Sequence, residues 1–429
     1  MSKLQELIQA LCPDGVPHLP IKEIASCYAG ATPKTTVKEY WDSGNIPWMS
    51  SGEVNKQIIT ETENFITQAG FDSCSTKMVP ANSVVIALAG QGKTRGLVAL
   101  TKIDLCTNQS LCAIVPNAQM NSSFLYHFLG SQYQKLRTVS SGDGTRGGLN
   151  LQMINSYVVP VPPIEVQDEI VRILDTFSAH AAELQAELQA RKEQYEYYRN
   201  LLLTFNPSAC GCGTEGEQEI EVTTWGGDNY KIAWKTMGEI GKFIRGNGLQ
   251  KKDFTDSGVG CIHYGQIYTH YGTFATETKS FVSRDFAKRL RKAKYGDLII
   301  ATTSENVEDV GKAVAWLGKD EIAISGDSYV FSHDQNPKFI AYLLQTHRFL
   351  QFKRMNVSGT KVTRISGESL EKYPIPIPPL ELQEKIVAIL DRFETFVNDL
   401  SQGLPAEIAA VKEQYEYYRN KLLTFKKTA

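Results

Sequence analysis

One nine-residue sequence occurs twice in this chain and sets the limits on its fold. Residues 192–200 read Lys-Glu-Gln-Tyr-Glu-Tyr-Tyr-Arg-Asn, and residues 412–420 read the same nine letters. The likeness continues upstream, where Tyr-Val-Val-Pro-Val-Pro-Pro-Ile-Glu-Val-Gln at 157–167 returns as Tyr-Pro-Ile-Pro-Ile-Pro-Pro-Leu-Glu-Leu-Gln at 373–383. Such repetition is typical of a chain built from two copies of one module.

Each copy predicts a long helix. In the first copy, apolar residues from Ile170 to Phe205 recur at alternating steps of four and three, with Arg191 breaking the series. A mean period of about 3.5 residues indicates a coiled-coil seam. Both helices are expected to begin after a Pro-Pro pair, at 162–163 and 378–379, because proline fits the first helical turn and prevents an earlier start.

The second helix is four residues longer than the first. The offset between the copies is 216 residues at their start (157 to 373) and 220 at their end (205 to 425). An insertion of four residues is a stutter, which locally unwinds a coiled coil. Gly403 and Pro405 lie at this point, so we expect a kink or a break there.

The segments between the helices contain short apolar runs bounded by turn residues, such as 83–88 and 297–301. These runs predict strands in two similar domains of mixed α and β structure, an α+β fold class. We therefore predict a first variable domain at 1–156, a first spacer helix at 157–205, a linker at 206–227, a second variable domain at 228–372 and a second spacer helix at 373–425.

Chain connectivity predicts how the helices pair. The ends of a domain usually lie close together, and the second variable domain begins where one helix ends and finishes where the other starts. The helices should therefore pack as an antiparallel coiled coil with a pseudo-twofold (cyclic) arrangement of the two domains. A helix of about 40 residues is about 60 Å long, which suits two DNA half-sites separated by about two helical turns.

Composition excludes several classes of protein. No run of about 18 apolar residues is present, and the N-terminus lacks the apolar core of a signal peptide. The eight cysteines are scattered, and Cys210-Gly-Cys212 has no second pair to complete a zinc site, so we expect free thiols in a reducing cytoplasm and no bound metal. The net charge of −2 does not by itself indicate nucleic-acid binding, and the distribution of charge is more informative.

The order of variable domain and helix, the Pro-Pro-Ile-Glu-Val-Gln167 and Pro-Pro-Leu-Glu-Leu-Gln383 entries and the Gln-Tyr-Glu-Tyr-Tyr-Arg helix ends resemble the DNA-specificity (S) subunit of a type I restriction–modification system. The resemblance extends over essentially the whole chain. It is nearest to the subgroup in which short insertions change the helix length.

This resemblance implies that each variable domain is a target-recognition domain that reads one half of a bipartite site in double-stranded DNA. It implies that the helices set the gap and dock two copies of an adenine-N6 methyltransferase (modification) subunit, which a restriction and translocase subunit joins. No cofactor is expected on this chain; S-adenosylmethionine, ATP and magnesium are expected on the partner subunits.

Candidate DNA contacts are polar and basic residues in Gly- and Thr-rich loops and in one dense basic run. The Gly-Gln-Gly92-Lys-Thr-Arg stretch resembles a P-loop without its first glycine, and Gly142-Asp-Gly144-Thr-Arg-Gly147 matches a dinucleotide fingerprint without its βαβ context, so neither predicts a nucleotide site. Basic side chains and Gln can contact phosphates or base edges, although each could equally be a solvated charge or a structural residue. The candidates are Lys34, Ser50, Ser51, Lys93, Thr94, Arg95, Arg146, Arg245, Lys251, Tyr264, Gln266, Lys288, Arg289, Arg291, Lys361 and Arg364.

The repeated helix ends predict a surface for a partner. Tyr197, Arg199, Tyr417 and Arg419 are identical in both copies and lie off the predicted seam. Aromatic residues and arginine are typical interface anchors, so we expect these four to contact the same partner at two equivalent places.

No catalytic motif is found. An adenine methyltransferase should show Asp or Asn, then Pro-Pro, then an aromatic residue, whereas the pairs here are flanked by Val161 and Ile164 and by Ile377 and Leu380. We therefore expect a subunit without catalytic residues that depends on its partners for base flipping and methyl transfer. Two alternatives remain open, a stand-alone DNA-binding regulator and a coiled-coil interaction scaffold.

Overall fold

The computed structural model of the chain describes residues 2–90, 94–139, 148–205, 219–223, 227–359, 361–398 and 403–428. The chain divides into two compact units. Unit 1 comprises 1–186 and 406–429, and unit 2 comprises 187–405. Each unit therefore combines one variable domain with parts of both repeat helices. Cys210 and Cys212 lie outside the described residues.

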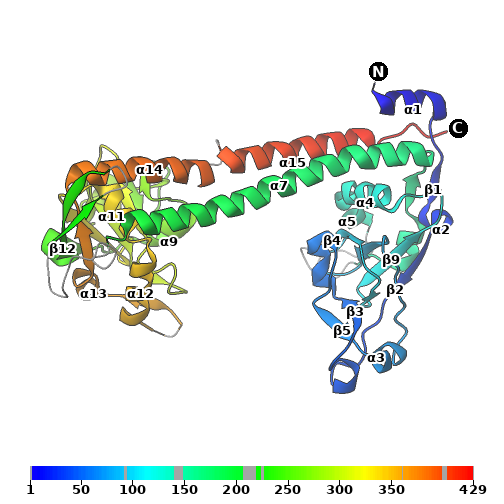
Figure 1. The fold of residues 1–429 in the computed structure, drawn as a ribbon, viewed down its shortest axis with the longest axis horizontal. Helices are drawn as coiled ribbons and strands as arrows, with labels where there is room; N and C mark the ends of the chain where they lie inside the picture. Colours follow the sequence, from blue (N-terminus) through cyan, green and yellow to red (C-terminus); the bar gives the residue numbers. More distant parts are fainter. Residues whose placement is uncertain are drawn as a thin grey trace. The chain divides into compact units, whose positions relative to one another are not determined.

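The core of unit 1 is a five-stranded sheet in the order β2-β9-β6-β7-β4; Figure 1 labels its strands β2, β9 and β4. Its central strands are short and apolar, and β6 and β7 are buried along their whole length, as expected of strands covered on both faces. Helix α4 packs against β6 and β7. The strands are β2 (Ala25–Ala29), β4 (Ile58–Ile59), β6 (Val84–Ala87), β7 (Val98–Thr101) and β9 (Leu111–Pro116).

A smaller sheet, β5-β3-β8, completes the domain of unit 1. Trp48 on β3 is buried and meets Trp41 edge to face, with ring centroids 5.1 Å apart, so both tryptophans belong to the protein core or its edge. The remaining elements are α1 (Lys3–Leu11), β1 (His18–Pro20), α2 (Ile21–Ile24), η1 (Lys38–Tyr40), β3 (Ile46–Met49), η2 (Ser51–Lys56), β5 (Asn64–Ile66), α3 (Gln68–Asp72), β8 (Cys106–Thr107), α4 (Ser122–Ser131), α5 (Tyr133–Val139), α6 (Leu151–Ser156) and β10 (Val158–Pro160).

Unit 2 repeats this plan. Its main sheet has the order β13-β22-β18-β20-β15, which matches that of unit 1 strand for strand along the chain. The strands are β13 (Gly241–Arg245), β15 (Phe274–Ala275), β18 (Leu298–Ala301), β20 (Ala313–Trp316) and β22 (Ser328–His333). The weak sequence similarity between the two variable domains thus reflects one shared topology, and the predicted α+β class with two similar domains is confirmed.

A second sheet in unit 2, β16-β14-β21-β17, corresponds to the smaller sheet of unit 1, and a further sheet has the order β19-β24-β23. The elements are α8 (Met237–Ile240), η5 (Lys251–Asp253), β14 (Val259–Ile262), α9 (Tyr264–Thr269), β16 (Ser280–Val282), α10 (Arg284–Ala287), β17 (Lys292–Ala293), β19 (Thr303–Ser304), β21 (Ile322–Ile324), α11 (Pro337–Leu343), α12 (His347–Asn356), β23 (Val357–Ser358), β24 (Thr363–Ile365) and α13 (Gly367–Glu371).

Both repeat helices begin directly after their Pro-Pro pair, at Ile164 and Leu380, as predicted. The entry residues before each pair, which the predicted ranges 157–205 and 373–425 include, form a strand, β10 in unit 1 and β25 (Pro374–Ile377) in unit 2, because the prolines in these segments cannot supply helical N–H groups. The predicted linker 206–227 contains β11 (Glu219–Thr223), which pairs with β12 (Asn229–Thr236). The predicted domain boundaries as a whole stay a prediction.

In each unit the start of one repeat helix packs against the end of the other. Helix α7 (Ile164–Leu203) is continuous for 40 residues and contributes to both units. In unit 1 the ring of Phe177 stacks on Tyr418, with centroids 5.3 Å apart. In unit 2 Tyr195 and Tyr198 stack on Phe393 at 6.4 and 5.7 Å. This is the antiparallel pairing that the sequence predicts.

The second repeat helix is described in two parts, α14 (Leu380–Asn398) and α15 (Gly403–Leu422). Gly403 has a φ of +71°, and a Cβ at this position would lie 2.6 Å from the carbonyl oxygen of Phe396. Only glycine tolerates both conditions. The predicted interruption at Gly403 is therefore confirmed.

The two chain ends meet in unit 1. The Val16 N–H donates to the carbonyl of Lys426 over 2.9 Å, and the Thr428 N–H donates to the carbonyl of Val16 over 3.1 Å. Helix α1 lies nearby, and its Leu4 is buried in the same hydrophobic cluster as Leu423. Figure 1 shows the N- and C-termini side by side. The two ends of the described chain therefore lie together in unit 1.

A buried glutamine fastens each domain to its helix. Gln167 and Gln383 are fully buried at equivalent positions on α7 and α14. The Gln167 Oε1 accepts from the Asn121 N–H over 2.8 Å, and its Nε2 donates to the Pro162 carbonyl over 2.7 Å. The Gln383 Oε1 accepts from the Asn336 N–H over 3.0 Å, and its Nε2 donates to the Pro378 carbonyl over 2.8 Å.

These bonds generate a stability prediction. The change Gln383→Ala leaves the Asn336 N–H and the Pro378 carbonyl without these partners in the protein interior, which should cost about 3 kcal/mol. We expect the melting temperature of unit 2 to fall by about 6–12 °C, measured by differential scanning calorimetry. The exposed neighbour Glu384 gives the control Glu384→Ala, which should leave the transition unchanged. Equal melting of the two variants would show that Gln383 is not an anchor.

Candidate nucleic-acid interface

Both units place a loop after their first sheet strand by the same close contact. A Cβ on Gly30 would collide with the carbonyl oxygen of Thr107, and one on Gly246 with that of Ser325. Glycine is required where backbones approach so closely. The loops that follow contain Lys34 in unit 1 and Lys251 in unit 2, and both side chains are exposed. The two predicted lysines therefore occupy corresponding loops.

A capped turn forms the second part of each site. In unit 1 the Ser50 N–H donates to Glu53 Oε2 over 2.7 Å, which caps η2. In unit 2 the His263 N–H donates to Gln266 Oε1 over 2.9 Å, which caps α9. Burial, followed by the nearby Lys251 charge, lowers the pKa of His263 below its ordinary value, so the imidazole is neutral at neutral pH.

The amide of Gln266 is used at both ends, because its Nε2 donates to Ser280 Oγ over 2.7 Å. Gln266 therefore holds the turn, and its contact with a base stays a prediction. Tyr264 and Ser51 each occupy the first position of their turn. Tyr264 is tied there by its backbone N–H, which donates to Ser325 Oγ over 2.9 Å.

Two predicted arginines come together in unit 2. Arg245 and Arg364 line one pocket of about 260 Å³ together with Thr302, Thr303 and Asp327. The Arg245 Nε donates to the Gly326 carbonyl over 3.2 Å, and Arg364 lies on β24 opposite Thr303. Two guanidinium groups at one hollow can meet a phosphate or the O6 and N7 of guanine. Lys361 is exposed just before this strand.

The basic run Lys288–Lys294 is held against the loop after β13 by Asn247. The Asn247 Nδ2 donates to the Arg289 carbonyl over 2.9 Å, and its Oδ1 accepts from the Arg291 N–H over 2.7 Å. Lys288 forms an exposed ion pair with Asp285 at 2.8 Å, which is worth little in water. The three predicted cations Lys288, Arg289 and Arg291 are all exposed, and Asn247 links their backbone to the loop that starts at Arg245.

In each unit, one backbone hydrogen bond joins the loop after the third sheet strand to the segment that precedes the spacer helix. The Leu149 N–H donates to the Leu88 carbonyl over 3.0 Å, just as the Ile365 N–H donates to the Thr302 carbonyl over 3.1 Å in unit 2. Thr94 and Arg95 are half-buried, and Thr94 Oγ1 donates to the Ala89 carbonyl over 3.4 Å. Lys93 and Arg146 lie outside the described residues, so their contacts with DNA stay predictions.

The four predicted partner residues separate into two kinds. Tyr197 and Tyr417 are 62% and 60% exposed and can meet another protein. Arg199 and Arg419 are half-buried instead and lie over the rings of Tyr195 and Tyr415, at 5.2 and 5.4 Å from the ring centroids. Arg199 also donates to Gln345 Oε1 over 3.4 Å. Arg199 thus joins the end of α7 to unit 2, whereas the ring contact of Arg419 lies within α15.

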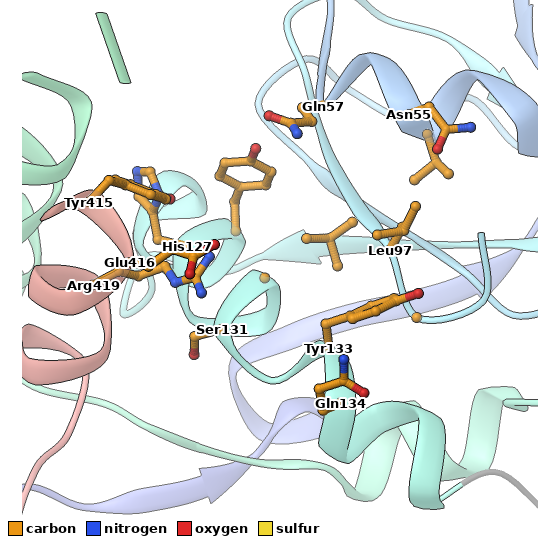
Figure 2. Close-up of a pocket in the computed structure, with 15 residues that line it drawn as sticks. Asn55, Gln57, Leu97, His127, Ser131, Tyr133, Gln134, Tyr415, Glu416 and Arg419 are labelled. Atoms are coloured by element: carbon orange, nitrogen blue, oxygen red, sulfur yellow. The ribbon is translucent and has the colours of Figure 1, made fainter. Parts of the chain in front are cut away.

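In unit 1 the residue Arg419 lines a pocket of about 470 Å³. Figure 2 shows Tyr415, Glu416 and Arg419 on one side of this pocket and Asn55 and Gln57 on another. Gly130 lines this pocket at the sequence position that Gln345 occupies in unit 2. The two helix ends are identical in sequence, but their immediate surroundings differ.

Sequence reasoning did not identify the polar contacts that fix these helix ends. His127 is buried, with Nε2 2.9 Å from Asp175 Oδ1 and Nδ1 2.9 Å from the Tyr415 hydroxyl. In unit 2 the Tyr342 hydroxyl oxygen lies 2.8 Å from Asp391 Oδ1 and 2.6 Å from Glu394 Oε2, and its one proton can be donated to either carboxylate. The repeat of Asp175 as Asp391 was the available signal, because an aspartate kept at one register of both helices suggests a shared polar partner.

The clamp at Asn247 generates a second prediction. The change Asn247→Ala removes both bonds to the basic run, at about 1 kcal/mol each, so the amide of Arg291 should exchange at least about fivefold faster. Hydrogen exchange followed by mass spectrometry measures this change. Asn247→Asp keeps the acceptor for the Arg291 N–H and should give a smaller increase. Unchanged protection in Asn247→Ala would show that the run is held by other contacts.

Comparison with known proteins places the chain in a family. Residues 13–193 and 231–410 each match the model of the type I restriction modification DNA specificity domain. These two segments make up most of the chain, so the chain belongs to this family of type I specificity subunits. The resemblance predicted from the sequence is thereby confirmed.

Individual relatives agree over nearly the full length. The chain is 27% identical over 450 residues to the type I restriction enzyme EcoR124I/EcoR124II specificity subunit of Escherichia coli, covering 100% of this chain and 98% of the relative. It is 26% identical to a putative type I specificity subunit, S.HindORF215P, of Haemophilus influenzae, covering 95% and 94%. A solved chain from a study of complex assembly in the type I R-M system is 19% identical, with a TM-score of 0.60 over 96% of this chain and 98% of that one. This structure supports the fold.

The described residues contain neither a membrane-spanning helix nor a cluster of metal ligands. None of the helices with assigned positions is long and apolar enough to cross a membrane. Within the same described ranges, no three His, Cys, Asp or Glu side chains gather in a way that could hold a metal ion.

Proposed function

We propose that this chain gives a type I methyltransferase and endonuclease complex its DNA sequence specificity, with each target-recognition domain reading one half of a bipartite site. The observation on which this rests is that one topology occurs twice with corresponding loops of different sequence. Gly30 and Gly246 place the first loop, Ser50 and His263 cap the second turn, and the exposed residues around them differ. Two similar frames with different loops suit the recognition of two different half-sites.

The chemistry of the second domain fits DNA. Arg245 and Arg364 share one hollow, while Lys251, Arg289 and Arg291 are exposed around the loop that follows β13. Arginine pairs bidentately with guanine, and exposed cations contact phosphates and make binding salt-dependent. The polar Thr302 and Thr303 at the hollow add further donors and acceptors. Such a mixture serves both orientation on the backbone and discrimination of bases.

The helices serve the assembly. The proposal assigns the gap between the half-sites to the repeat helices, because α7 contributes residues to both units. The exposed Tyr197 and Tyr417 lie in identical nine-residue sequences. In this proposal they are the docking points of two copies of an adenine-N6 methyltransferase subunit. Catalysis, S-adenosylmethionine, ATP and magnesium belong to the partner subunits in this proposal, which also places the complex in the cytoplasm.

The deciding experiment maps methylated adenines in a host that expresses this chain with a modification subunit, against a host that lacks the chain. A split motif with a fixed gap that appears only with the chain supports the proposal. Methylation that does not depend on the chain refutes it, and DNA binding by the chain without any partner would favour a stand-alone regulator.

A third prediction assigns the half-sites to the domains. Arg364→Ala should weaken or relax recognition of the half read by the second domain, by about 10- to 100-fold for one good base contact, and Arg95→Ala should do so for the other half only. Methylation of duplexes with single-base changes measures both effects. The two variants serve as controls for each other, and loss of both halves in either one would indicate misfolding.

A fourth prediction concerns the gap. Removing Leu404–Glu407 deletes four residues near the interruption at Gly403 and restores equal lengths of the two repeats. We expect the preferred gap between the half-sites to change while the bases of both halves stay the same. The methylated motif of the deletion variant provides the measurement. An unaltered gap would show that the length of the second repeat helix does not set the spacing of the half-sites.

A further inference from the structure

The loop after the third strand of the main sheet is built in the same way in both units. In unit 2 this loop, Thr302–Val310, joins β18 to β20 and closes where the Gly311 N–H donates to the Ala301 carbonyl over 2.8 Å. In unit 1 the Gly96 N–H donates to the Ala87 carbonyl over 2.9 Å. Both glycines have a left-handed φ, +79° and +83°. The closing geometry is therefore common to the two domains.

A basic side chain from a later helix, α12 in unit 2 and α5 in unit 1, lies next to each closing glycine. A Cβ on Gly311 would lie 3.3 Å from Lys353 Cδ, and one on Gly96 would lie 3.7 Å from Arg137 Cγ. Lys353 and Arg137 are 216 residues apart, which is the offset of the repeat at the helix entries. The frame beneath the loop is thus a repeated feature.

The sequence of the loop is not repeated. Residues 88–95 read Leu-Ala-Gly-Gln-Gly-Lys-Thr-Arg, whereas 302–310 read Thr-Thr-Ser-Glu-Asn-Val-Glu-Asp-Val. A constant frame below a variable tip is the arrangement expected of a loop that determines specificity. In unit 2 the loop also borders the arginine hollow, since Thr302 and Thr303 line it with Arg245 and Arg364.

Lys353 holds this loop by direct bonds to its backbone. The side chain is 4% exposed, and its Nζ donates to the carbonyl oxygens of Glu308 and Val310, each over 2.7 Å. A buried ammonium group is tolerated only when its donors are satisfied. The two hydrogen bonds therefore hold the Lys353 side chain and the backbone of the loop at Glu308 and Val310 in one relative position. Burial lowers the pKa of Lys353 to about 8, which leaves the group mainly protonated at neutral pH.

We propose that Lys353 is a positioning residue for recognition: by holding the carbonyls of Glu308 and Val310 it sets the conformation of the Thr302–Val310 loop, and this loop selects bases in the half-site read by the second domain. The inference rests on the proposed function and deepens it. Glu305 at the exposed tip of the loop offers a carboxylate that can accept from the amino group of cytosine.

The chain supplies a matched control on the same helix. Arg354 is next to Lys353, but its side chain is 60% exposed and its Nη2 lies 3.5 Å from the Glu308 carboxylate rather than from the loop backbone. Lys353→Met and Arg354→Met remove the same charge from neighbouring positions. A difference between the two variants therefore reports the backbone bonds and not the loss of a cation near DNA.

The test uses the full chain together with its modification subunit, on duplexes that carry single-base changes in either half-site. For Lys353→Met, the ratio of methylation rates on cognate and altered second-domain halves should fall at least about fivefold at one or more positions. Discrimination in the first-domain half should be unchanged, and Arg354→Met should retain both. Lys353→Arg, which keeps the charge and its donors, should recover part of the discrimination.

Full discrimination by folded Lys353→Met would overturn the inference, as would equal losses in Lys353→Met and Arg354→Met. If Lys353→Met does not fold, Lys353→Gln takes its place; failure of both to give a folded second unit would assign Lys353 to the stability of the domain and also overturn the inference. Wild-type chain that directs no methylation to any split motif would instead refute the proposed function, so the two failures are distinguishable.

Discussion

The attachment of each variable domain to its helix is the constraint on which the rest of the structure depends. A fully buried amide, Gln167 or Gln383, joins the first turn of a repeat helix to the start of a domain helix through the backbone N–H of Asn121 or Asn336. Because a buried amide costs free energy when a partner is missing, the angle between domain and helix is restricted at that point. The position of the sheets and of the candidate DNA-contacting loops relative to the helix in each unit therefore depends on this junction.

A second set of contacts ties the same domain to the other repeat helix. His127 lies between Asp175 of α7 and Tyr415 of α15, so each unit is stabilised by helix segments that are far apart in the sequence. In unit 2 Tyr342 contacts Asp391 and Glu394 of α14, while Arg199 of α7 reaches Gln345. Each domain is thus stabilised by both repeat helices, although the contacting residues differ between the two units.

The repeat itself made much of this fold predictable. Identical letters and a heptad period predict the helices and the interruption at Gly403 from local sequence, and the order of domains and helices along the chain predicts the antiparallel pairing. The site was less predictable, since its bonds join distant residues. Gln266 has the right side chain to read adenine, yet its amide is used to hold a turn. The sequence did not identify Asn247 or Lys353 as important residues. Their roles depend on backbone groups that lie far away in the sequence and come close only in the folded structure.

The meeting of the chain ends gives the molecule an unusual connectivity. Val16 is bonded to Lys426 and Thr428, so the last residues of the second repeat enter the first domain much as the end of the first repeat leads into the second domain. The order of elements is therefore that of a cycle opened at one place. A chain opened elsewhere in this cycle, with its present ends joined by a short peptide, would keep every contact described within the two units.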